Sequence, residues 1–587
     1  MLRLRVGFLL IAMVLSVFAA RLVQLQGIDP REYAQMAADE GSVTAVLPAE
    51  RGRILDRNGL PLADSVDGLM VVANPSVTGP NAPGLATLLS KRLDVDYFET
   101  LRRLRIPEGA EGHQFQYIAR KVPATRATNV LEEAEARGWK GLDTREDPVR
   151  FYPGKDVAAN LVGFLGTPYE DGSARPLAGL EAAFNRYLSG VDGEATYQVS
   201  KGSRLPLGDT TITPARDGND LITTIDQDLQ WKAQQVLRQT VLGARADSGY
   251  AVVLERSTGD VLALADYPTY DASSPYDPSV PAGEADANHN SRALTDVYEP
   301  GSVEKVLTLS GLIDAGKVTS RTKFEVPGAL HRQDRTIHDY FEHGTIRLTL
   351  AGILAKSSNI GTVMAADKFD RGQLRRYLTG FGLGERTNVG LGGETRGLLP
   401  SGAMWTSQTA DRIAFGQSLS VNALQMAAAV NTIANGGVRV SPSIIRGEAT
   451  ADDGRVVGTD TATERRVVSE DAARQTALMM ERVIDPEAGV APRAAVPGYR
   501  VAGKTGTAQR VGEGCGCYDG TFTVSFAGFA PADDPEFTIY IVVQNPRNGQ
   551  GGGSVAGPAF STLMGYTLRR YGIPPTGARP SQLPVEW

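Results

Sequence analysis

The chain has 587 residues, of which 42% are hydrophobic, and a net charge of −7, so it is long enough for roughly two to four folded domains. This acidic balance argues against a nucleic-acid-binding protein that works by bulk charge. The only two cysteines, Cys515 and Cys517, exclude a zinc site built on three or four thiolates and a disulfide-dense scaffold.

An uninterrupted apolar run, Val6 to Ala20, follows two N-terminal arginines, Arg3 and Arg5. Flanking leucines extend the apolar stretch to residues 6–25, close to the ~20 residues of a transmembrane helix. The arginines predict that residues 1–5 lie in the cytoplasm and that the remainder lies outside it. A cleaved signal peptide is the alternative, because the run also has the length of a signal-peptide core. Either segment places the rest of the chain outside the cytoplasm.

Residues 40–215 mix short strand-like runs with charged helices and contain no cluster of catalytic side chains. Within them, Asn58-Gly59 predicts a hairpin turn between two short apolar segments. A linker-like stretch, residues 207–218, precedes a short β-branched strand at residues 221–225. We therefore predict one domain at residues 40–215 and a second at residues 219–587.

The second region mixes strands and helices. Residues 250–254 and 261–265 predict a hairpin, and residues 525–529 and 537–543 predict adjacent antiparallel strands. Residues 303–313 and 424–434 predict buried helices. The expected architecture is α+β, an antiparallel sheet covered by helices.

Three short patterns that can carry chemistry occur in order in this region: S-x-x-K at 302–305, S-x-N at 357–359 and K-T-G at 504–506. The first two patterns recur at 320–323 and 420–422, so neither is specific alone. Ser302 opens the predicted buried helix, where the helix dipole favours an alkoxide, and Lys305 lies one turn on, on the same face. Ser320 lies in a polar turn that no helix follows, so Ser302 is the better candidate.

The chemistry of these residues is complementary. Lys305 can act as a base only as a neutral amine, and burial and a second cation, Lys504, would both lower its pKa. The Ser357 hydroxyl can relay a proton, and the Asn359 amide can bind a substrate carbonyl. Lys504 and Gly506 lie in a predicted edge strand, with which an extended peptide could pair.

The three motifs in this order resemble those of the penicilloyl-serine transferases, most closely the class B penicillin-binding proteins. The likeness continues around the motifs at residues 299–302, 356–361 and 503–509, and to N-terminal segments at 51–59 and 179–190. The tail, residues 525–532, 544–546 and 552–560, is similar to the division-specific FtsI type. The resemblance implies a C-terminal transpeptidase domain with a five-stranded antiparallel sheet and helical layers. An elongated pedestal or dimerisation-type domain and one transmembrane helix would precede it.

The resemblance implies a serine D,D-transpeptidase that crosslinks peptidoglycan stem peptides through an acyl-enzyme in septal wall synthesis, with neither cofactor nor metal. By motif position its catalytic residues would be Ser302, Lys305, Ser357, Asn359 and Lys504. The family's substrate-binding residues correspond to Thr505, Gly506 and Thr507, with the two threonine hydroxyls on the terminal carboxylate. The backbone N–H groups of Ser302 and Thr507 would hold the oxyanion.

The partners implied by the resemblance are stem peptides, lipid-linked precursor glycan, β-lactam antibiotics, the membrane, an FtsW-like SEDS glycosyltransferase and divisome proteins, without nucleic acid. An elongation-specific class B enzyme stays an alternative. A β-lactamase would leave the large N-terminal domain and the anchor unexplained, and a β-lactam sensor would need further transmembrane helices.

Glu304 departs from the family, which usually carries an uncharged residue there. A carboxylate facing Lys305 would raise the pKa of that lysine and weaken its assignment as the base.

Three further patterns have weaker interpretations. Residues 498–505 match the G-x-x-x-x-G-K-[ST] string of nucleotide hydrolases, but the segment is β-like and no helix start follows it. The histidine-rich stretch fits no metal motif and is expected to be a solvated polar loop; it contains His331, His338, Asp339, Glu342 and His343. Cys515 and Cys517 could be free thiols or a tight disulfide.

Overall fold

The computed structural model describes residues 2–24, 42–106, 116–166, 173–200, 203–204, 210–276, 288–333, 335–512, 514, 516–549 and 551–587. The chain divides into two compact units. Unit 1 comprises residues 1–52, 65–149 and 189–219, and unit 2 comprises residues 53–64, 150–188 and 220–587.

Helix α1 spans Leu2–Val23 and confirms the predicted N-terminal apolar helix. Within the described chain it is the one helix whose length and composition would allow it to cross a membrane, at Arg5–Val23. Its large apolar side chains are not packed against protein: Phe8 is 68% exposed and Leu9 is 71% exposed. A lipid environment would remove this apolar surface from water.

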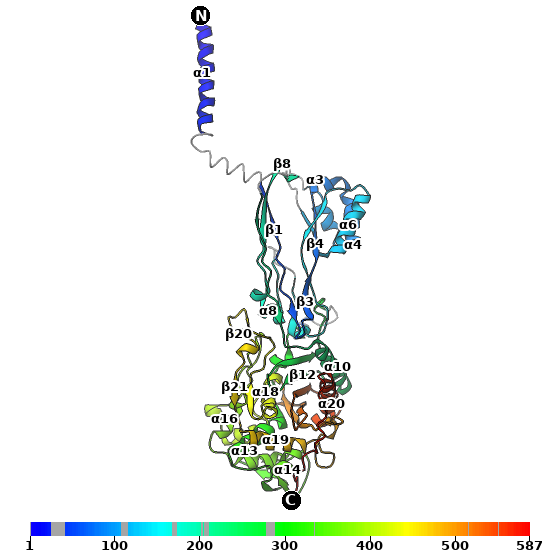
Figure 1. Cartoon of the computed structure of the whole chain (residues 1–587), viewed down its shortest axis with the longest axis vertical. Helices are drawn as coiled ribbons and strands as arrows, with labels where there is room; N and C mark the ends of the chain where they lie inside the picture. Colours follow the sequence, from blue (N-terminus) through cyan, green and yellow to red (C-terminus); the bar gives the residue numbers. More distant parts are fainter. Residues whose placement is uncertain are drawn as a thin grey trace. The chain divides into compact units, whose positions relative to one another are not determined.

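Two sheets and a layer of helices make up the rest of unit 1 (Figure 1). In one sheet, β8 (Gly193–Ser200) lies between β1 (Ser42–Leu47) and β10 (Thr210–Thr213), and β9 (Ser203–Arg204) pairs with β8. In the other, β4 (Gly68–Ala73) lies between β5 (Gln116–Pro123) and β6 (Leu142–Glu146). The helices are α3 (Pro75–Thr78), η2 (Gly79–Asn81), α4 (Ala82–Leu93), α5 (Tyr97–Arg103) and α6 (Ala124–Ala136). Fully buried apolar residues such as Val71, Leu85 and Val130 join this sheet to the helices.

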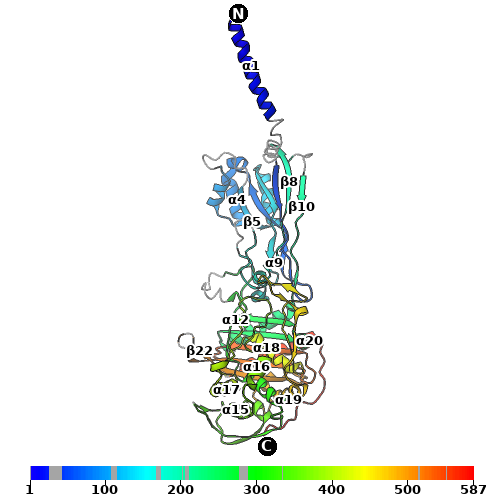
Figure 2. The same cartoon turned by 90° about the vertical axis from the view of Figure 1, so that its left-hand side faces the viewer.

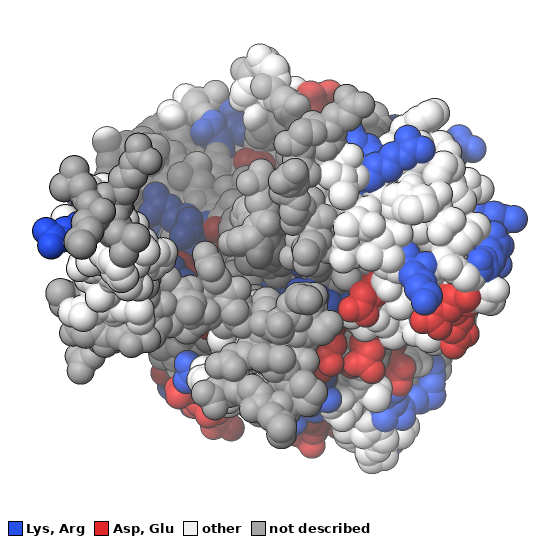
Figure 3. Space-filling model, turned by 90° about the horizontal axis from the view of Figure 1, so that it is seen from above, with Lys and Arg blue, Asp and Glu red and all other residues white. Residues whose placement is uncertain are grey.

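Acidic and basic side chains are mixed on the surface of unit 1. Arg92 and Arg137 both pair with Glu133, at 2.8 and 2.5 Å. On the described part of the face in Figure 3, blue Lys and Arg side chains likewise lie among red Asp and Glu side chains. Such exposed pairs add little to stability, and they spread charge over the surface instead of separating it by sign.

Unit 2 is built on a five-stranded antiparallel sheet in the order β13-β12-β24-β23-β22, which confirms the predicted α+β fold. The strands are β12 (Ser248–Glu255), β13 (Val261–Tyr267), β22 (Ala502–Val511), β23 (Tyr518–Ala530) and β24 (Phe537–Gln544). All residues of β24 are buried, because helices cover both faces of the sheet. Strand β22 lies at the edge of the sheet (Figure 2).

The two faces of this sheet carry different helices. Helices α10 (Gln227–Ala244) and α20 (Gly552–Arg570) cover one face, and α18 (Ala423–Ala434) packs on the other (Figure 1). Phe526 packs against Phe560 of α20 with ring centroids 4.7 Å apart, whereas the Thr538 hydroxyl donates to Asn431 of α18 at 2.7 Å. Because side chains alternate along a strand, the register places Lys504 on the α18 face.

The remaining helices of this part of unit 2 are α12 (Arg292–Thr295), η3 (Gly301–Val303), α13 (Lys305–Asp314), α14 (Leu350–Ala355), α15 (Asn359–Ala366), α16 (Gln373–Gly380), η4 (Gly402–Met404), α17 (Ser407–Ile413), η5 (Thr459–Thr461), α19 (Glu470–Glu481) and η6 (Pro492–Ala494), of which η6 packs against α20. Small two-stranded sheets lie between them: β14 (Lys323–Val326) with β17 (Ile346–Thr349), β15 (Leu330–His331) with β16 (Thr336–Ile337), β18 (Val438–Val440) with β21 (Glu464–Arg466), and β19 (Ala449–Thr450) with β20 (Val456–Val457). The helices predicted at 303–313 and 424–434 are therefore confirmed, with shifted ends.

Two stretches of the N-terminal half pack within unit 2. Strand β2 (Ile54–Leu55) pairs in parallel with β11 (Leu221–Ile222) and antiparallel with β3 (Pro61–Val66), next to β7 (Val149–Phe151). Helices α7 (Ala159–Val162), α8 (Gly179–Ala183) and α9 (Asn185–Leu188) follow. Gly59 has φ +84° between β2 and β3, which confirms the predicted turn. The contacts thus do not follow the single boundary predicted at residues 215–219, because strand pairing joins segments far apart in sequence.

Candidate active site

Ser302 lies in η3, a single 3-10 turn that precedes α13, and not in the α-helix itself. The turn starts at Gly301, whose φ of +55° favours glycine, and a Cβ there would lie 2.8 Å from the Thr507 carbonyl oxygen. A Cβ on Gly416 would lie 1.9 Å from the Gly301 carbonyl oxygen. Three backbone segments therefore meet at Ser302. None of the described residues hydrogen-bonds its half-buried hydroxyl, which leaves the hydroxyl available to a ligand.

Lys305 is fully buried and contacts the S-x-N motif. Its Nζ donates to the Ser357 carbonyl oxygen and to Asn359 Oδ1, both at 2.7 Å, and lies 3.4 Å from Ser357 Oγ. A neutral amine has two N–H donors and one lone pair, and the two carbonyl oxygens account for both donors. The arrangement thus suits a neutral Lys305 amine whose lone pair can accept a proton.

The S-x-N motif occupies the turn between α14 and α15. Ser357 has φ +57°, a conformation that residues other than glycine adopt rarely. The next residue, Ser358, caps α15, because its hydroxyl accepts the Gly361 N–H at 2.9 Å. The cap fixes the start of the helix, so that Ser357 and Asn359 both reach Lys305.

Lys504 is the second fully buried lysine. Its Nζ donates to Ser357 Oγ at 2.9 Å and to the carbonyl oxygen and Oγ1 of Thr505, both at 3.1 Å. These three acceptors match the three N–H donors of an ammonium group. The Ser357 hydroxyl therefore connects the two lysines.

The rest of the K-T-G-T segment faces the start of α13. A Cβ on Gly506 would lie 2.3 Å from Ser525 Oγ and 2.8 Å from the Pro300 carbonyl oxygen, so only glycine fits between β23 and the turn before Ser302. Thr505 is 8% exposed, whereas Thr507 is exposed at the edge of the sheet. The two predicted oxyanion donors, the N–H groups of residues 302 and 507, belong to these touching segments.

Burial lowers the pKa of both lysines. It lowers the pKa of Lys305 to about 7, against opposing effects of Asp339 and Glu304. It also lowers the pKa of Lys504 well below the usual value, and the positive charge of Lys305 adds to this shift. Two buried amines that share one hydroxyl therefore favour fewer than two charges. The shared Ser357 hydroxyl provides a path for a proton between the two amines.

Glu304, the departure from the family pattern, lies on the buried side of the helix. Its Oε1 accepts the Thr308 hydroxyl at 2.6 Å, and its Oε2 has no partner among the described residues. Burial raises the pKa of Glu304 well above the usual value. A neutral carboxyl group exerts little field on Lys305, so Glu304 is compatible with a neutral lysine.

The loop between β16 and β17 also contacts the site, which the sequence did not predict. The histidine-rich stretch of the sequence analysis lies in this loop and was expected to be solvated. That expectation is wrong for two of its residues, because the side chain of Asp339 is 0% exposed and that of His343 is 6% exposed. Asp339 Oδ1 accepts the Ile360 N–H at 3.0 Å, and the His338 carbonyl oxygen accepts from Asn359 Nδ2 at 3.1 Å. The sequence showed that the loop is rich in histidine and acidic residues, but only the fold places the loop next to the S-x-N motif.

The competing interpretations of two motifs are excluded. Ser320 lies in a turn before β14, with no helix after it, and the Lys323 amine lies 4.5 Å from the centre of the Trp587 ring. The string at residues 498–505 runs into strand β22, where a phosphate-binding loop requires a helix.

Two remaining patterns lie outside this site. His331 contacts the Thr336 hydroxyl at 2.9 Å within the β15–β16 hairpin. Cys517 is disulfide-bonded, and Cys515 lies outside the described residues.

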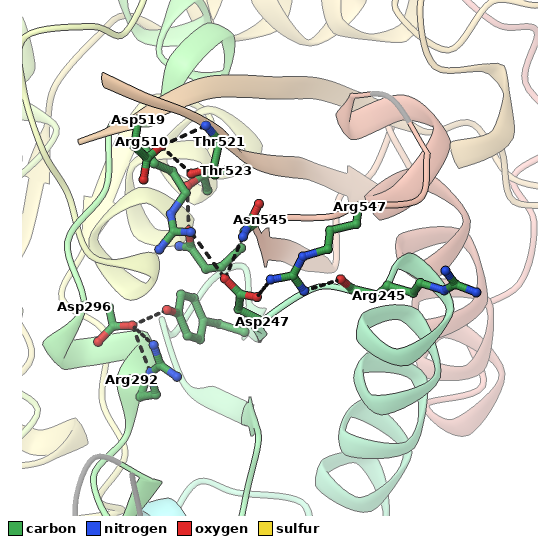
Figure 4. Close-up of polar contacts among 12 residues, drawn as sticks. Arg245, Asp247, Arg292, Asp296, Arg510, Asp519, Thr521, Thr523, Asn545 and Arg547 are labelled. Carbon is green, nitrogen blue, oxygen red and sulfur yellow. Dashed lines mark hydrogen bonds and ion pairs between the residues drawn. The ribbon is translucent and has the colours of Figure 1, made fainter. Parts of the chain in front are cut away.

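A cavity of about 580 Å³ lies beside the C-terminal end of β22, where Arg292, Asp296, Glu299 and Arg510 contribute to its lining. Figure 4 shows two ion pairs beside it: Arg292 pairs with Asp296, at 2.9 Å, and Arg510 pairs with Asp247, at 3.5 Å. The edge of β22 therefore leads from Thr507 to a polar cavity.

Both units match known families. Residues 249–565 match the penicillin-binding protein transpeptidase domain, and residues 46–223 match the penicillin-binding protein dimerisation domain. The chain is 35% identical to penicillin-binding protein PbpB of Mycolicibacterium smegmatis, over 97% of this chain and 90% of the relative. It is 31% identical to the peptidoglycan D,D-transpeptidase FtsI of Escherichia coli K12, over 96% of this chain and 91% of the relative.

Solved structures share the fold over nearly the same length. A peptidoglycan synthetase from Bifidobacterium adolescentis is 30% identical with a TM-score of 0.70, covering 93% of this chain and 100% of that structure. Penicillin binding protein 3 from Mycobacterium tuberculosis, complexed with aztreonam, is 31% identical with a TM-score of 0.68, covering 92% of this chain and 100% of that structure. The likeness thus extends well beyond the three short motifs.

Proposed function

The chain belongs to the class B penicillin-binding proteins and is a peptidoglycan D,D-transpeptidase, and on that premise we propose that Ser302 is its nucleophile. One observation carries this assignment: Lys305, Ser357, Asn359 and Lys504 converge in a buried hydrogen-bonded network one helical turn from the Ser302 hydroxyl. The network can accept a proton at one amine and deliver a proton from the other.

In the proposed acylation step, Lys305 accepts the hydroxyl proton of Ser302 as Oγ attacks the carbonyl carbon of the penultimate D-alanine. The backbone N–H groups of Ser302 and Thr507 stabilise the negative charge that develops on the carbonyl oxygen. The bond to the terminal D-alanine then breaks, and its amine takes a proton from Lys504 through the Ser357 hydroxyl. D-alanine leaves and an ester remains on Ser302, while the lysine pair keeps its total charge.

In the second step, an amine of another stem peptide attacks the ester carbonyl. The amine loses a proton to the lysine pair, Ser302 regains its hydroxyl proton, and the new amide is the crosslink. The product is a peptide bond and the enzyme returns to its starting state, so the reaction needs neither oxidant nor cofactor.

The donor peptide would pair along the edge of β22. The hydroxyl groups of Thr505 and Thr507 would bind its terminal carboxylate, on either side of Gly506 in the strand. Asn359 donates one amide N–H to the His338 carbonyl oxygen, so its second N–H is available for a substrate carbonyl. The remainder of the donor would then run toward the cavity at the end of β22.

We further propose that β-lactams acylate Ser302, because their reactive amide would occupy the place of the D-Ala-D-Ala bond. Related structures of penicillin binding protein 3 from M. tuberculosis are complexes with aztreonam and with ampicillin. The proposed orientation has residues 1–5 in the cytoplasm, α1 in the membrane and the transpeptidase domain outside.

The likeness to E. coli FtsI and to the PbpB proteins supports a septal role, with an FtsW-like glycosyltransferase and divisome proteins as partners. The proposed pedestal at residues 40–215 would position the transpeptidase domain, residues 219–587, and contact these partners. Elongation is the alternative role. A fluorescent fusion should gather at the division site; a signal along the side wall would favour elongation.

Labelling of the detergent-solubilised full chain with fluorescent penicillin tests the nucleophile. Wild type should carry the label on the peptide that contains Ser302, and Ser302→Ala should carry none. Ser320→Ala, the matched control from the other S-x-x-K string, should label like wild type. Lys305→Met should slow labelling by roughly a factor of 100 or more, because it removes the proposed base. Label on Ser302→Ala would refute the assignment.

A further inference from the structure

We propose that Asp339 and His343 form a positioning pair that holds the Asn359 amide in place and sets the electrostatic field at Lys305. The inference rests on the proposed function, because it requires that Lys305 be the base. The pair lies in the loop between β16 and β17, outside the three catalytic motifs.

Asp339 is built into the start of α15. Its fully buried carboxylate accepts the backbone N–H of Ile360 at 3.0 Å and the Nε2–H of His343 at 3.1 Å. The loop and the start of α15 therefore hold the carboxylate in one position.

The His343 ring contacts two oxygen atoms: Nε2 lies 3.1 Å from Asp339 Oδ2, and Nδ1 lies 2.6 Å from the Gly344 carbonyl oxygen. The ring thus connects the Asp339 carboxylate to the backbone of the loop. The centroids of the Phe341 and His343 rings lie 4.9 Å apart, so the Phe341 ring helps to shield the pair from water.

The same loop determines how Asn359 is oriented. The carbonyl oxygen of His338, the residue before Asp339, accepts from Asn359 Nδ2, while Asn359 Oδ1 accepts from Lys305 Nζ. The amide cannot be reversed without placing a donor against the lysine and an acceptor against a carbonyl oxygen. Asp339, which anchors both the loop and the backbone of residue 360, thus keeps the oxygen of Asn359 on the lysine.

The charges around Lys305 come from three elements. Glu304 precedes Lys305 in the chain and burial raises its pKa, Lys504 lies on β22, and Asp339 lies on the loop. The charge of Asp339 raises the pKa of Lys305, whereas burial, the larger effect, lowers it. Burial and then the same charge raise the pKa of the neighbouring Tyr340. His343, which contacts the Asp339 carboxylate, fixes the position from which this charge acts on Lys305.

Two substitutions separate this role from simple structural support. Asp339→Asn keeps an oxygen for the Ile360 N–H but removes the negative charge, so the acid limb of penicillin acylation should move to lower pH by about one unit. His343→Gln removes the ring that contacts Asp339 Oδ2, so the carboxylate loses its fixed position and raises the pKa of Lys305 less; the same limb should move to lower pH by a smaller amount. The measurement is the second-order rate of acylation of the full chain by fluorescent penicillin between about pH 5 and 9.

His331→Gln is the matched control, because His331 lies in the neighbouring hairpin and should leave the profile unchanged. Shifts of both variants to lower pH, the larger one for Asp339→Asn, support the pair. An absent shift in either variant, or a shift to higher pH, overturns it even where the rate falls. If a melting curve shows that one variant does not fold, the shift of the other decides. Label on Ser302→Ala would instead refute the proposed function itself.

Discussion

The free energy of unfolding should respond to Glu304→Gln in a pH-dependent way. The carboxyl group of Glu304 is fully buried, and burial raises its pKa well above the model-peptide value of 4.5. Between those two pKa values the unfolded chain has lost the proton and the folded chain has kept it, so wild-type stability falls as the pH rises. The loss is about 1.4 kcal/mol for each pH unit in that interval. Below about pH 4 both states are protonated and the contribution disappears.

Glutamine has nearly the same shape and keeps an oxygen for the Thr308 hydroxyl, but it does not ionise. Its buried N–H groups have a fixed cost that is the same at every pH. The assay is urea unfolding of the detergent-solubilised chain at pH 5, 6 and 7. The difference between Glu304→Gln and wild type should grow in favour of the variant as the pH rises, by about 1.4 kcal/mol for each pH unit that lies between the two pKa values. Glu487→Gln, at an exposed position, is the control and should show no such slope.

Parallel stability curves for wild type and Glu304→Gln would refute this reasoning, because they would mean that the carboxyl group ionises alike in both states. The acylation profile gives an independent check. A neutral Glu304 exerts little field on Lys305, so Glu304→Gln should leave the acid limb in place. A shift of that limb to lower pH would show that Glu304 is ionised.

Two further predictions concern the wild-type profile and a buried ion pair. Because the pKa of Lys305 is lowered to about 7, the rate of penicillin acylation should rise roughly tenfold between pH 6 and 8 as the neutral fraction grows; a flat profile would contradict Lys305 as the base. Glu181 pairs with Arg150 at 2.6 Å with both side chains buried, so Glu181→Ala should lower stability in urea by about 3–5 kcal/mol. Asp471→Ala, which breaks an exposed pair with Arg474, should change it little, and equal losses would argue against burial as the cause.

Much of the site could be predicted because its parts are local in sequence. Ser302 and Lys305 are three residues apart, a spacing that places them on one face of a helix. The strand that carries Lys504 could also be predicted from its own residues. The 3-10 turn at Ser302 was not, because it depends on Gly301 and Gly416 meeting through backbone contacts between distant segments.

The loop that carries Asp339 and His343 shows the opposite case. A run of histidine and acidic residues predicts a solvated surface, since such residues are mostly exposed. They are buried here because a tertiary contact supplies their hydrogen-bond partners, among them the backbone of Ile360. Composition cannot reveal whether a polar side chain will find such partners.

The amino-acid sequence alone determined the N-terminal apolar helix, the alternation of strands in the C-terminal sheet and the order of the three motifs. Each of these is encoded over a few residues, in hydrophobic periodicity or in close spacing. Only the tertiary structure decided that segments 53–64 and 150–188 pack within unit 2 and that two lysines share one serine hydroxyl. It also decided that Glu304 is buried. Those properties arise from contacts between residues far apart in the chain, and burial in a low-dielectric interior, which no local pattern specifies, determines their charge states.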